Sequence, residues 1–220
     1  MILQAILWDL DGVLADTFEL HYQTWAAAFA GRDLPFSRPL YHRAFGMNNK
    51  DLIAVLLGHP AEPEFVTQVS AQKERAFQQA APKLVRSFPG VPEWLAQAHA
   101  LGLSQAVASS APQANIEVLV EALGFRPYFA ALVAGYDLPG KPEPAVFLEA
   151  ARRLDVSPAA CLVIEDSLAG VTAAKRAGMR CLAVTNTSPA GVLAEADWVV
   201  ASLAEVGLER VVVDIPPRFT

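Results

Sequence analysis

Short apolar runs recur along the second half of the chain, each followed by a polar loop and a stretch with helical periodicity. The runs have the length of buried strands and cover residues 103–108, 129–134, 160–164 and 181–184, with a shorter one at 198–200. Strands that alternate with helices in this way predict a parallel sheet covered by helices on both faces. The chain also opens on an apolar run, residues 2–7, which predicts one more buried strand ending on Asp9.

The stretch between this first strand and residue 81 has helical periodicity and no strand-like run. Aromatic residues recur there at steps of four, three and four, which predicts one aromatic helix face made of Phe18, Tyr22, Trp25 and Phe29. Two more helices are predicted, one over residues 51–57, closed by Gly58, and a longer one over about 63–79. We therefore predict a small helical domain inserted behind the first strand.

Length and composition are typical of a compact globular protein. The 220 residues suit one large domain or a domain with an insert, and 53% of them are hydrophobic, with a mean hydropathy of +0.30. No apolar run approaches the ~18 residues that span a bilayer. The amino terminus has no basic flank of the kind found in secretory signals. We therefore expect a cytoplasmic protein.

Charge and cysteine content narrow the classes of partner. The net charge is −6 and no block of Lys or Arg is present, which argues against nucleic acid or an anionic membrane as the main partner. The only two cysteines, Cys161 and Cys181, both stand at the start of apolar runs. They are predicted to be free, buried thiols, in preference to a disulfide or a metal-binding pair.

Polar side chains stand at the ends of three predicted strands. In chain order these are Asp9 and Asp11, then Ser109 and Ser110, then Glu165 and Asp166. The carboxyl ends of parallel strands lie at one edge of a sheet, where open α/β folds place their chemistry. Gly12 follows the first pair of acids and allows the chain to turn sharply. Lys141 precedes a further predicted helix, so it belongs to the same edge.

Each of these groups has an ordinary structural explanation when it is considered alone. Ser109 or Ser110 could cap the helix that follows, and Lys141 could be a surface lysine. Glu165 and Asp166 are harder to explain, because adjacent acids at a buried strand end need compensation. Together the groups offer carboxylates for a metal, a hydroxyl and an ammonium. These are the parts needed to bind and neutralise a phosphoryl group.

In this order, Asp9-x-Asp11-Gly-Val-Leu-x-Asp-Thr, Ser109, Lys141-Pro and Glu165-Asp166 resemble the four-motif signature of the haloacid dehalogenase superfamily. The likeness spans nearly the whole chain. Within the superfamily it is similar to the phosphatase and β-phosphoglucomutase branch, which has a helical cap after the first motif. The resemblance implies an α/β fold with a Rossmann-like parallel-sheet core (residues 1–16 and 82–220), an α-helical cap domain (residues 17–81) and a Mg²⁺ cofactor.

The resemblance also implies roles for the two aspartates of the first motif. Asp9 would attack phosphorus and become an aspartyl-phosphate. Asp11 would protonate the leaving oxygen and then accept a proton from the incoming nucleophile. The family's dehalogenases and phosphonate-cleaving members do not keep an aspartate at the position of Asp11, so those two chemistries are set aside.

The remaining motif residues would bind the ion and the phosphoryl group. The resemblance implies that Asp9, the backbone carbonyl of Asp11 and Asp166 hold Mg²⁺, with Glu165 supporting the ion directly or through water. Ser109 and Lys141 would bind the phosphoryl oxygens, and Ser110 is a further candidate substrate contact.

The cap is expected to decide the substrate. Lys73 lies on the apolar stripe of the helix predicted over 63–79, so it either snorkels to solvent or points into the cleft as an anion contact. It matches a substrate-side lysine of β-phosphoglucomutase-like proteins. Thr17, His21 and Trp25 match the same branch, although His21 and Trp25 are equally explained as cap residues with no part in binding.

One loop departs from the family pattern. The mutases of the branch carry an arginine in the cap loop after a Gly, and the corresponding residues here are Gly46 and Asn49. Lys50 is one residue further and could substitute, but it lacks the rigid fork of arginine. A mutase must retain a bisphosphate intermediate while the intermediate reorients in the site, and this loop offers weaker anchoring for it. We therefore favour a phosphatase acting on a small sugar-phosphate monoester. The alternatives are a β-phosphoglucomutase and a non-catalytic binding protein that keeps the fold.

The expected partner is therefore a small phosphorylated metabolite, with no nucleic acid and no membrane. The aromatic residues of the cap fit a dimer contact as well as a buried core. A monomer or a weak dimer is expected on this basis.

Overall fold

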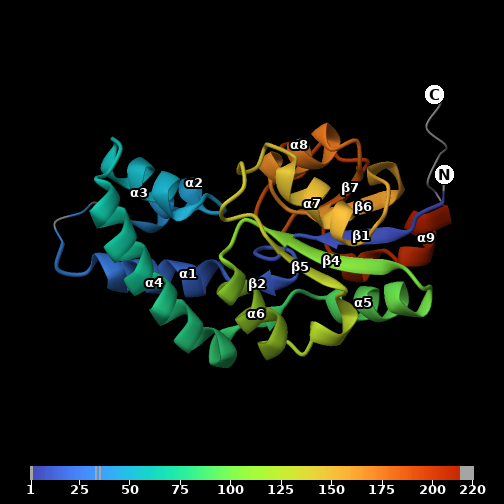
Figure 1. The fold of residues 1–220 in the computed structure, drawn as a ribbon, viewed down its shortest axis with the longest axis horizontal. Helices are drawn as coiled ribbons and strands as arrows, with labels where there is room; N and C mark the ends of the chain where they lie inside the picture. The colour runs from blue at the N-terminus through green and yellow to red at the C-terminus, as the bar shows by residue number, and fades with distance from the viewer. Residues whose placement is uncertain (1, 33, 35, 214–220) are drawn as a thin grey trace.

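The chain folds into two lobes, a helical lobe and a larger lobe built on a sheet (Figure 1). The computed structural model describes residues 2–32, 34 and 36–213. The sheet lobe holds the first strand and nearly everything after residue 85, and the helical lobe holds the segment between. Among the described residues no helix is both long and apolar enough to cross a membrane.

Within the described residues, six strands form one parallel sheet with the order β5-β4-β1-β6-β7-β8. The strands are β1 (Ala5–Trp8), β4 (Ser104–Ser109), β5 (Ala131–Ala134), β6 (Cys161–Glu165), β7 (Arg180–Val184) and β8 (Trp198–Val200). The predicted α/β fold is thereby confirmed. In the central strand, Trp8 pairs with Val107 on one side and with Ile164 on the other. This register brings the chain after Trp8 beside the ends of β4 and β6.

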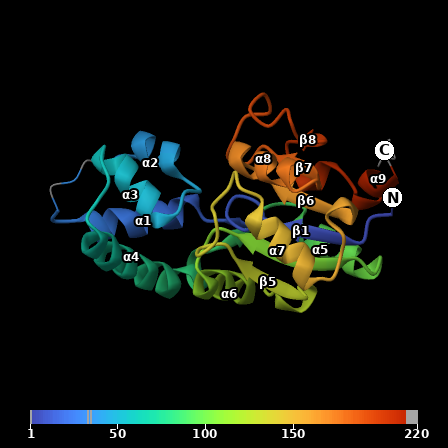
Figure 2. The same cartoon turned by 45° about the horizontal axis from the view of Figure 1, so that its top comes forward.

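Helices cover both faces of this sheet, as Figures 1 and 2 show. They are α5 (Val91–Ala100), α6 (Gln113–Ala122), α7 (Ala145–Arg153), α8 (Leu168–Arg176) and α9 (Leu208–Val213). The apolar residues of α5, α6 and α9 pack in one core with alternate residues of β1, while those of α7 and α8 pack in a second core on the other face. Both faces of the strands are therefore buried, which explains their continuous apolar sequences. Cys161 and Cys181 lie in the second core as free thiols, as predicted.

In the described part of the helical lobe, four helices surround an aromatic core. They are α1 (Phe18–Phe29), α2 (Arg38–Ala44), α3 (Asn49–Leu57) and α4 (Pro63–Leu84). The predicted aromatic face of α1 is confirmed, with Trp25 and Phe29 buried and Phe18 and Tyr22 packed against them. Helix α3 is capped by the Asn48 side chain, which accepts from the backbone of Asp51, and ends at Gly58 as predicted.

A short two-stranded ladder joins the lobes. Strand β2 (Ala15–Asp16) pairs antiparallel with β3 (Arg86–Ser87), and neither strand was predicted. The expected end of the last cap helix near residue 79 was wrong, because α4 continues to Leu84 with Pro82 inside its last turn. Ala81 and Val85 are buried in the main core, and this packing outweighs the hydrogen bond lost at Pro82. The predicted boundary between the cap and the core, between residues 81 and 82, remains a prediction and falls inside α4.

Candidate active site

Two glycines make room for carboxylates at the carboxyl edge of the sheet. Asp9 directly follows β1, and Gly12 turns the chain with a φ of +92°. A Cβ at Gly12 would overlap the carboxylate of Asp166. A Cβ at Gly170 would overlap the carboxylate of Glu165 in the same way. Both positions therefore need glycine for the acids to sit where they do.

Three acids converge at this edge. Asp9, Glu165 and Asp166 are buried, and each offers an oxygen that lies within 4.8 Å of the others. The Lys141 ammonium reaches in from the loop before α7 and donates to Asp9 Oδ1 at 2.5 Å and to Glu165 Oε1 at 2.6 Å. The second oxygen of Glu165 accepts from the backbone of Asp166 and from both the backbone and the hydroxyl of Ser167. Acids at the ends of β1 and β6 are thus assembled in one place with the lysine of the loop before α7.

The pKa values reflect an excess of acid in this cluster. Burial raises the pKa of Asp9 to about 7, and neighbouring Glu165 adds to the effect against the opposing Lys141. Burial, Glu165 and Asp9 raise the pKa of Asp166 well above its ordinary value. Glu165 is also desolvated, but Lys141 and the backbone donors hold its pKa below the ordinary value. One ammonium does not neutralise three carboxylates, so the cluster fits a divalent cation, and its all-oxygen ligands suit Mg²⁺.

The raised pKa values predict a pH-dependent response to metal. In the metal-free protein, the folded state holds the Asp9 proton up to a pKa of about 7, against 3.8 for the ordinary group. The bound proton therefore contributes to the stability of the folded state in full below pH ~4, and this contribution is lost as the pH rises through ~7. A cation needs the deprotonated carboxylates and should restore this loss. We expect the increase in Tm on adding Mg²⁺ to be several degrees larger at pH 8 than at pH 5.5, measured by thermal unfolding. An equal increase at both values would contradict the acid cluster as the binding site.

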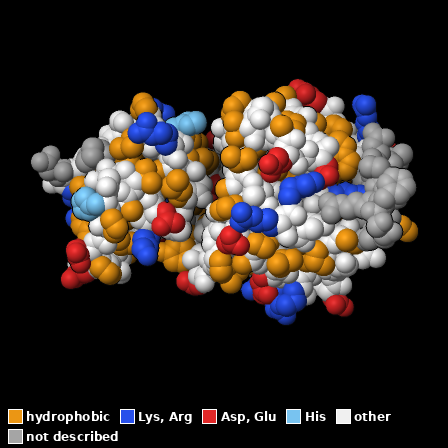
Figure 3. Space-filling model, turned by 90° about the horizontal axis from the view of Figure 1, so that it is seen from above, with side chains coloured by type: hydrophobic (Ala, Val, Ile, Leu, Met, Phe, Trp, Pro, Cys, Tyr) orange, Lys and Arg blue, Asp and Glu red, His pale blue; other side chains and the backbone are white. Residues whose placement is uncertain are grey.

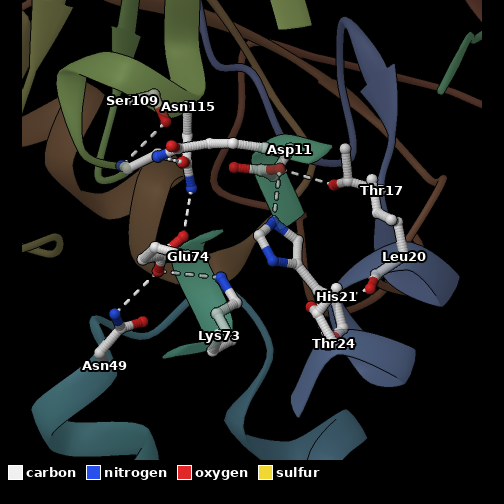
Figure 4. A network of polar contacts seen from close by, with 12 residues as sticks. Asp11, Thr17, Leu20, His21, Thr24, Asn49, Lys73, Glu74, Ser109 and Asn115 are labelled. Atoms are coloured by element: carbon white, nitrogen blue, oxygen red, sulfur yellow. Dashed lines mark hydrogen bonds and ion pairs between the residues drawn. The ribbon is translucent and has the colours of Figure 1, made fainter. Parts of the chain in front are cut away.

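Asp11 stands apart from the three clustered acids and contacts Thr17 and the helical lobe. Its Oδ1 accepts from the Thr17 hydroxyl at 2.6 Å and lies 3.1 Å from His21 Nε2 (Figure 4). The pKa of Asp11 is lowered: burial would raise it, but His21 and Thr17 outweigh burial. The His21 ring stacks on Phe77 of α4, with centroids 4.2 Å apart. Thr17 and His21 therefore fix the orientation of the second aspartate from the first turn of α1.

Lys73 points inward, which decides between the two orientations left open by the sequence. Lys73 is only 2% exposed, and its ammonium lies 4.9 Å from the centre of the Phe77 ring and 5.5 Å from that of the Trp25 ring. It donates to Glu74 Oε1 at 3.0 Å. Glu74 also accepts from Asn49 at 2.8 Å and, across the gap between the lobes, from Asn115 of α6 at 2.6 Å. Figure 4 shows this network opposite Asp11 and His21.

Two adjoining cavities lie between the lobes, where the space-filling view narrows (Figure 3). The larger, about 380 Å³, contains the acid cluster, Lys141 and both serines. The smaller, about 60 Å³, lies against the helical lobe. Four residues line both cavities, namely Asp11, Phe45, Gly46 and Ser110. Asp11 therefore stands where the two spaces meet.

Most predicted site residues line one of these cavities. The predicted residues that line the larger cavity are Asp9, Asp11, Thr17, Gly46, Ser109, Ser110, Lys141, Glu165 and Asp166. Those that line the smaller cavity are His21, Trp25, Asn49 and Lys73, together with Asp11, Gly46 and Ser110. Lys50 is exposed and lines neither, so the structure does not bring it to the site as the stand-in for the missing arginine. Neither Ser109 nor Ser110 caps α6, whose N-cap is Pro112; the Ser109 hydroxyl accepts from the backbone of Ala111 instead.

Several site residues were not predicted. Thr187 donates its hydroxyl to the Asp166 carboxylate, and Asn186 donates to the Gly12 carbonyl at 2.7 Å. Both follow β7, so the rule used for the other strand ends would have found them. Glu74 and Asn115 had no such signal, because a Lys-Glu pair in a helix and an Asn near a helix start are typical of solvated surfaces.

Known proteins match this chain over most of its length. The haloacid dehalogenase-like hydrolase family matches residues 3–178. The β-phosphoglucomutase of Bacillus subtilis is 34% identical over 215 residues, 94% of this chain and 93% of that protein. The phosphorylated carbohydrates phosphatase of Thermotoga maritima is 30% identical over 182 residues, 80% of this chain and 82% of that protein. A mutant of CbbY from Rhodobacter sphaeroides, solved in complex with xylulose-(1,5)bisphosphate, has a TM-score of 0.85 at 31% identity and covers 94% of this chain and 97% of its own. The chain therefore belongs to the haloacid dehalogenase-like hydrolases, in the branch with a helical cap that includes β-phosphoglucomutase and CbbY.

Proposed function

We propose that the protein is a Mg²⁺-dependent phosphatase that hydrolyses a small sugar-phosphate-type monoester through an aspartyl-phosphate on Asp9. The observation that carries this proposal is the separation of the two aspartates of the first motif. Asp9 belongs to the acid cluster with Lys141, while Asp11 turns to Thr17 and His21 at the junction of the cavities. The two acids therefore occupy different places, Asp9 beside the groups that would bind the phosphoryl oxygens and Asp11 where the leaving oxygen would lie, as a nucleophile and a proton-transfer group require.

The residues of the chain divide the chemistry between them. Asp9 attacks phosphorus, and Lys141 and Ser109 neutralise and orient the phosphoryl oxygens. Asp11 protonates the leaving oxygen and then takes a proton from the attacking water. Asp9, Asp166, the Asp11 carbonyl and Glu165 would hold Mg²⁺, which supplies charge neutralisation at the phosphoryl oxygens when bound. Hydrolysis of the aspartyl-phosphate regenerates Asp9.

The substrate class rests on the relatives. The Thermotoga phosphatase acts on phosphorylated carbohydrates and the Rhodobacter protein binds a sugar bisphosphate, as their names state. The Bacillus mutase supports the second candidate, β-phosphoglucomutase activity. Against that candidate, Asn49 carries no charge and its amide is engaged by Glu74. Water needs no such anchoring, so we favour hydrolysis.

A substrate panel tests the proposal. The protein should release phosphate from sugar monophosphates with Mg²⁺ and lose this activity in excess EDTA. With β-glucose 1-phosphate and a bisphosphate primer, it should form free phosphate. Accumulation of glucose 6-phosphate without free phosphate would establish the mutase instead. No turnover of any ester in the panel or of an aryl phosphate would favour the non-catalytic alternative.

Replacing Lys73 with Ala should raise KM for a sugar phosphate by about tenfold or more, because a buried charged donor is removed from the substrate side of the smaller cavity. The kinetics with a minimal aryl phosphate should change little. Steady-state measurements on both esters check this, with Lys83→Ala near the end of the same helix as the control. Equal losses on the two esters would place Lys73 outside substrate recognition.

A further inference from the structure

Glu74 is the acid of the smaller cavity that the reaction leaves unexplained. Its side chain is 13% exposed, and both of its oxygens accept hydrogen bonds. Lys73 and Asn49 donate to one oxygen and Asn115 to the other. Burial would raise the pKa of Glu74, but Lys73 and the two amides lower it below the ordinary value, so the group is ionised at neutral pH.

The smaller cavity presents both signs of charge side by side. Among the described residues that line it, Lys73 is the one lysine or arginine, and Glu74 and Asp11 are the acids. An anion placed here would meet Glu74 and Asp11 at close range, and a cation would meet Lys73. A hydroxyl group meets no like-charge repulsion, because it is uncharged and can donate to a carboxylate and accept from an ammonium.

The position of Asp11 relates this cavity to the reaction. If Asp11 protonates the leaving oxygen, that oxygen lies where the two cavities join. The phosphoryl group then occupies the larger cavity, and the alcohol part extends toward Glu74. The volume of about 60 Å³ accommodates a few water-sized groups, such as hydroxyls on a short carbon chain.

We propose that Glu74, paired with Lys73, makes this cavity selective for an uncharged, hydroxyl-bearing end of the substrate and excludes an end that carries a carboxylate or a second phosphate. The inference rests on the proposed function, because it needs the phosphoryl group at Asp9. Glu74 is thus a specificity-determining residue for the part of the substrate remote from phosphorus.

Contacts between the lobes hold this selecting group in place. Glu74 belongs to α4 and Asn115 to α6, and Asn115 also accepts from Gln78 of α4 at 2.9 Å. The carboxylate is therefore positioned from both sides of the gap, and it cannot easily turn away from an unsuitable ligand. We therefore expect this cavity to exclude a bisphosphate, whereas the CbbY relative was solved with one bound.

Two six-carbon esters test the proposal. Sorbitol 6-phosphate and 6-phosphogluconate share their phosphate and differ at the far end, which is a hydroxymethyl group in one and a carboxylate in the other. The wild-type protein should prefer sorbitol 6-phosphate by about 100-fold or more in kcat/KM, because buried like charges repel strongly. Glu74→Gln keeps the shape and removes the charge, and it should reduce the preference at least about tenfold. Glu64→Gln, at an exposed acid in the first turn of the same helix, should leave it unchanged.

The outcomes separate this inference from the proposed function. Comparable turnover of both esters by the wild-type protein, or an unchanged preference in Glu74→Gln, would overturn the inference and leave the phosphatase intact. If the wild-type protein hydrolyses neither ester, the affinity of the Asp9→Asn variant for each ester, measured by calorimetry with Mg²⁺, decides whether the cavity is selective. Tighter binding of sorbitol 6-phosphate there supports the inference whether or not the substrate panel supports the proposed activity, and equal binding overturns the inference. The same wild-type and Asp9→Asn comparisons decide the matter if Glu74→Gln does not fold.

Discussion

Replacing Asp9 with Asn should lower Mg²⁺-dependent phosphate release by about 10⁴-fold or more, because the amide cannot attack phosphorus. The change keeps the side-chain shape and an oxygen that can accept from Lys141, so binding of substrate should survive. The measurement is kcat with the best ester of the panel, together with the Kd of that ester. A loss confined to Kd would show that Asp9 binds substrate without acting as the nucleophile.

Stability provides the internal control for this variant. The ionised Asp9 is buried next to two other acids, and its raised pKa marks the resulting cost. Asp9→Asn should therefore unfold at the same or a higher temperature than the metal-free wild-type protein at pH 8. Asp155→Asn is a matched exchange on the surface, at a left-handed position that Asn also tolerates, and it should leave kcat unchanged within about twofold.

Replacing Asp11 with Asn should slow turnover of alkyl phosphates by about 10²- to 10⁴-fold, because proton transfer to the leaving oxygen is lost. The amide oxygen can still accept from the Thr17 hydroxyl, so the local geometry should persist. The leaving group of an aryl phosphate needs less protonation, so transfer of its phosphoryl group to Asp9 should be slowed less. Removal of the phosphoryl group from Asp9 by water still needs a base, so the variant should give a burst of about one equivalent of nitrophenol followed by slow release.

The contrast between the two esters identifies the role of Asp11. Rapid-mixing kinetics with p-nitrophenyl phosphate measure the burst, and steady-state assays measure the alkyl ester. Equal losses on both esters without a burst would show that Asp11 acts through the fold or the cation site and not through proton transfer. His21→Gln is a useful partner variant, because its amide nitrogen can still donate to Asp11 while the imidazole is removed.

The sheet and the strand-end residues proposed for the candidate site were predictable because both depend on local sequence patterns. Apolar runs of three to six residues marked the strands, and the acids at the ends of β1 and β6 marked the edge where they meet. The parallel arrangement places Asp9 and Glu165 on the same edge, and the adjacency of β1 and β6 in the structure brings them together. Thr187 could have been found by the same rule at the end of β7.

The cap contacts depend on tertiary packing that no local pattern reveals. Glu74 is polar, adjacent to a lysine and set in a long helix, which describes many solvated residues. Its burial follows from the approach of α6, which brings Asn115 to within 2.6 Å. The extension of α4 past Pro82 has the same origin, since the packing of Ala81 and Val85 overrides the local preference of proline. The inward direction of Lys73 also became clear only with its partner in view.

In the proposed reaction the phosphoryl group passes through Asp9, and trapping the covalent intermediate examines this step itself. Asp11→Asn would be mixed with substrate and Mg²⁺, quenched in acid within the burst, and digested for mass spectrometry. We predict that the peptide containing Asp9 gains the mass of one phosphoryl group, and that the same peptide from Asp9→Asn does not. Burst release of nitrophenol with no phosphorylated peptide, or with the phosphoryl group on another residue, would exclude Asp9 as the nucleophile.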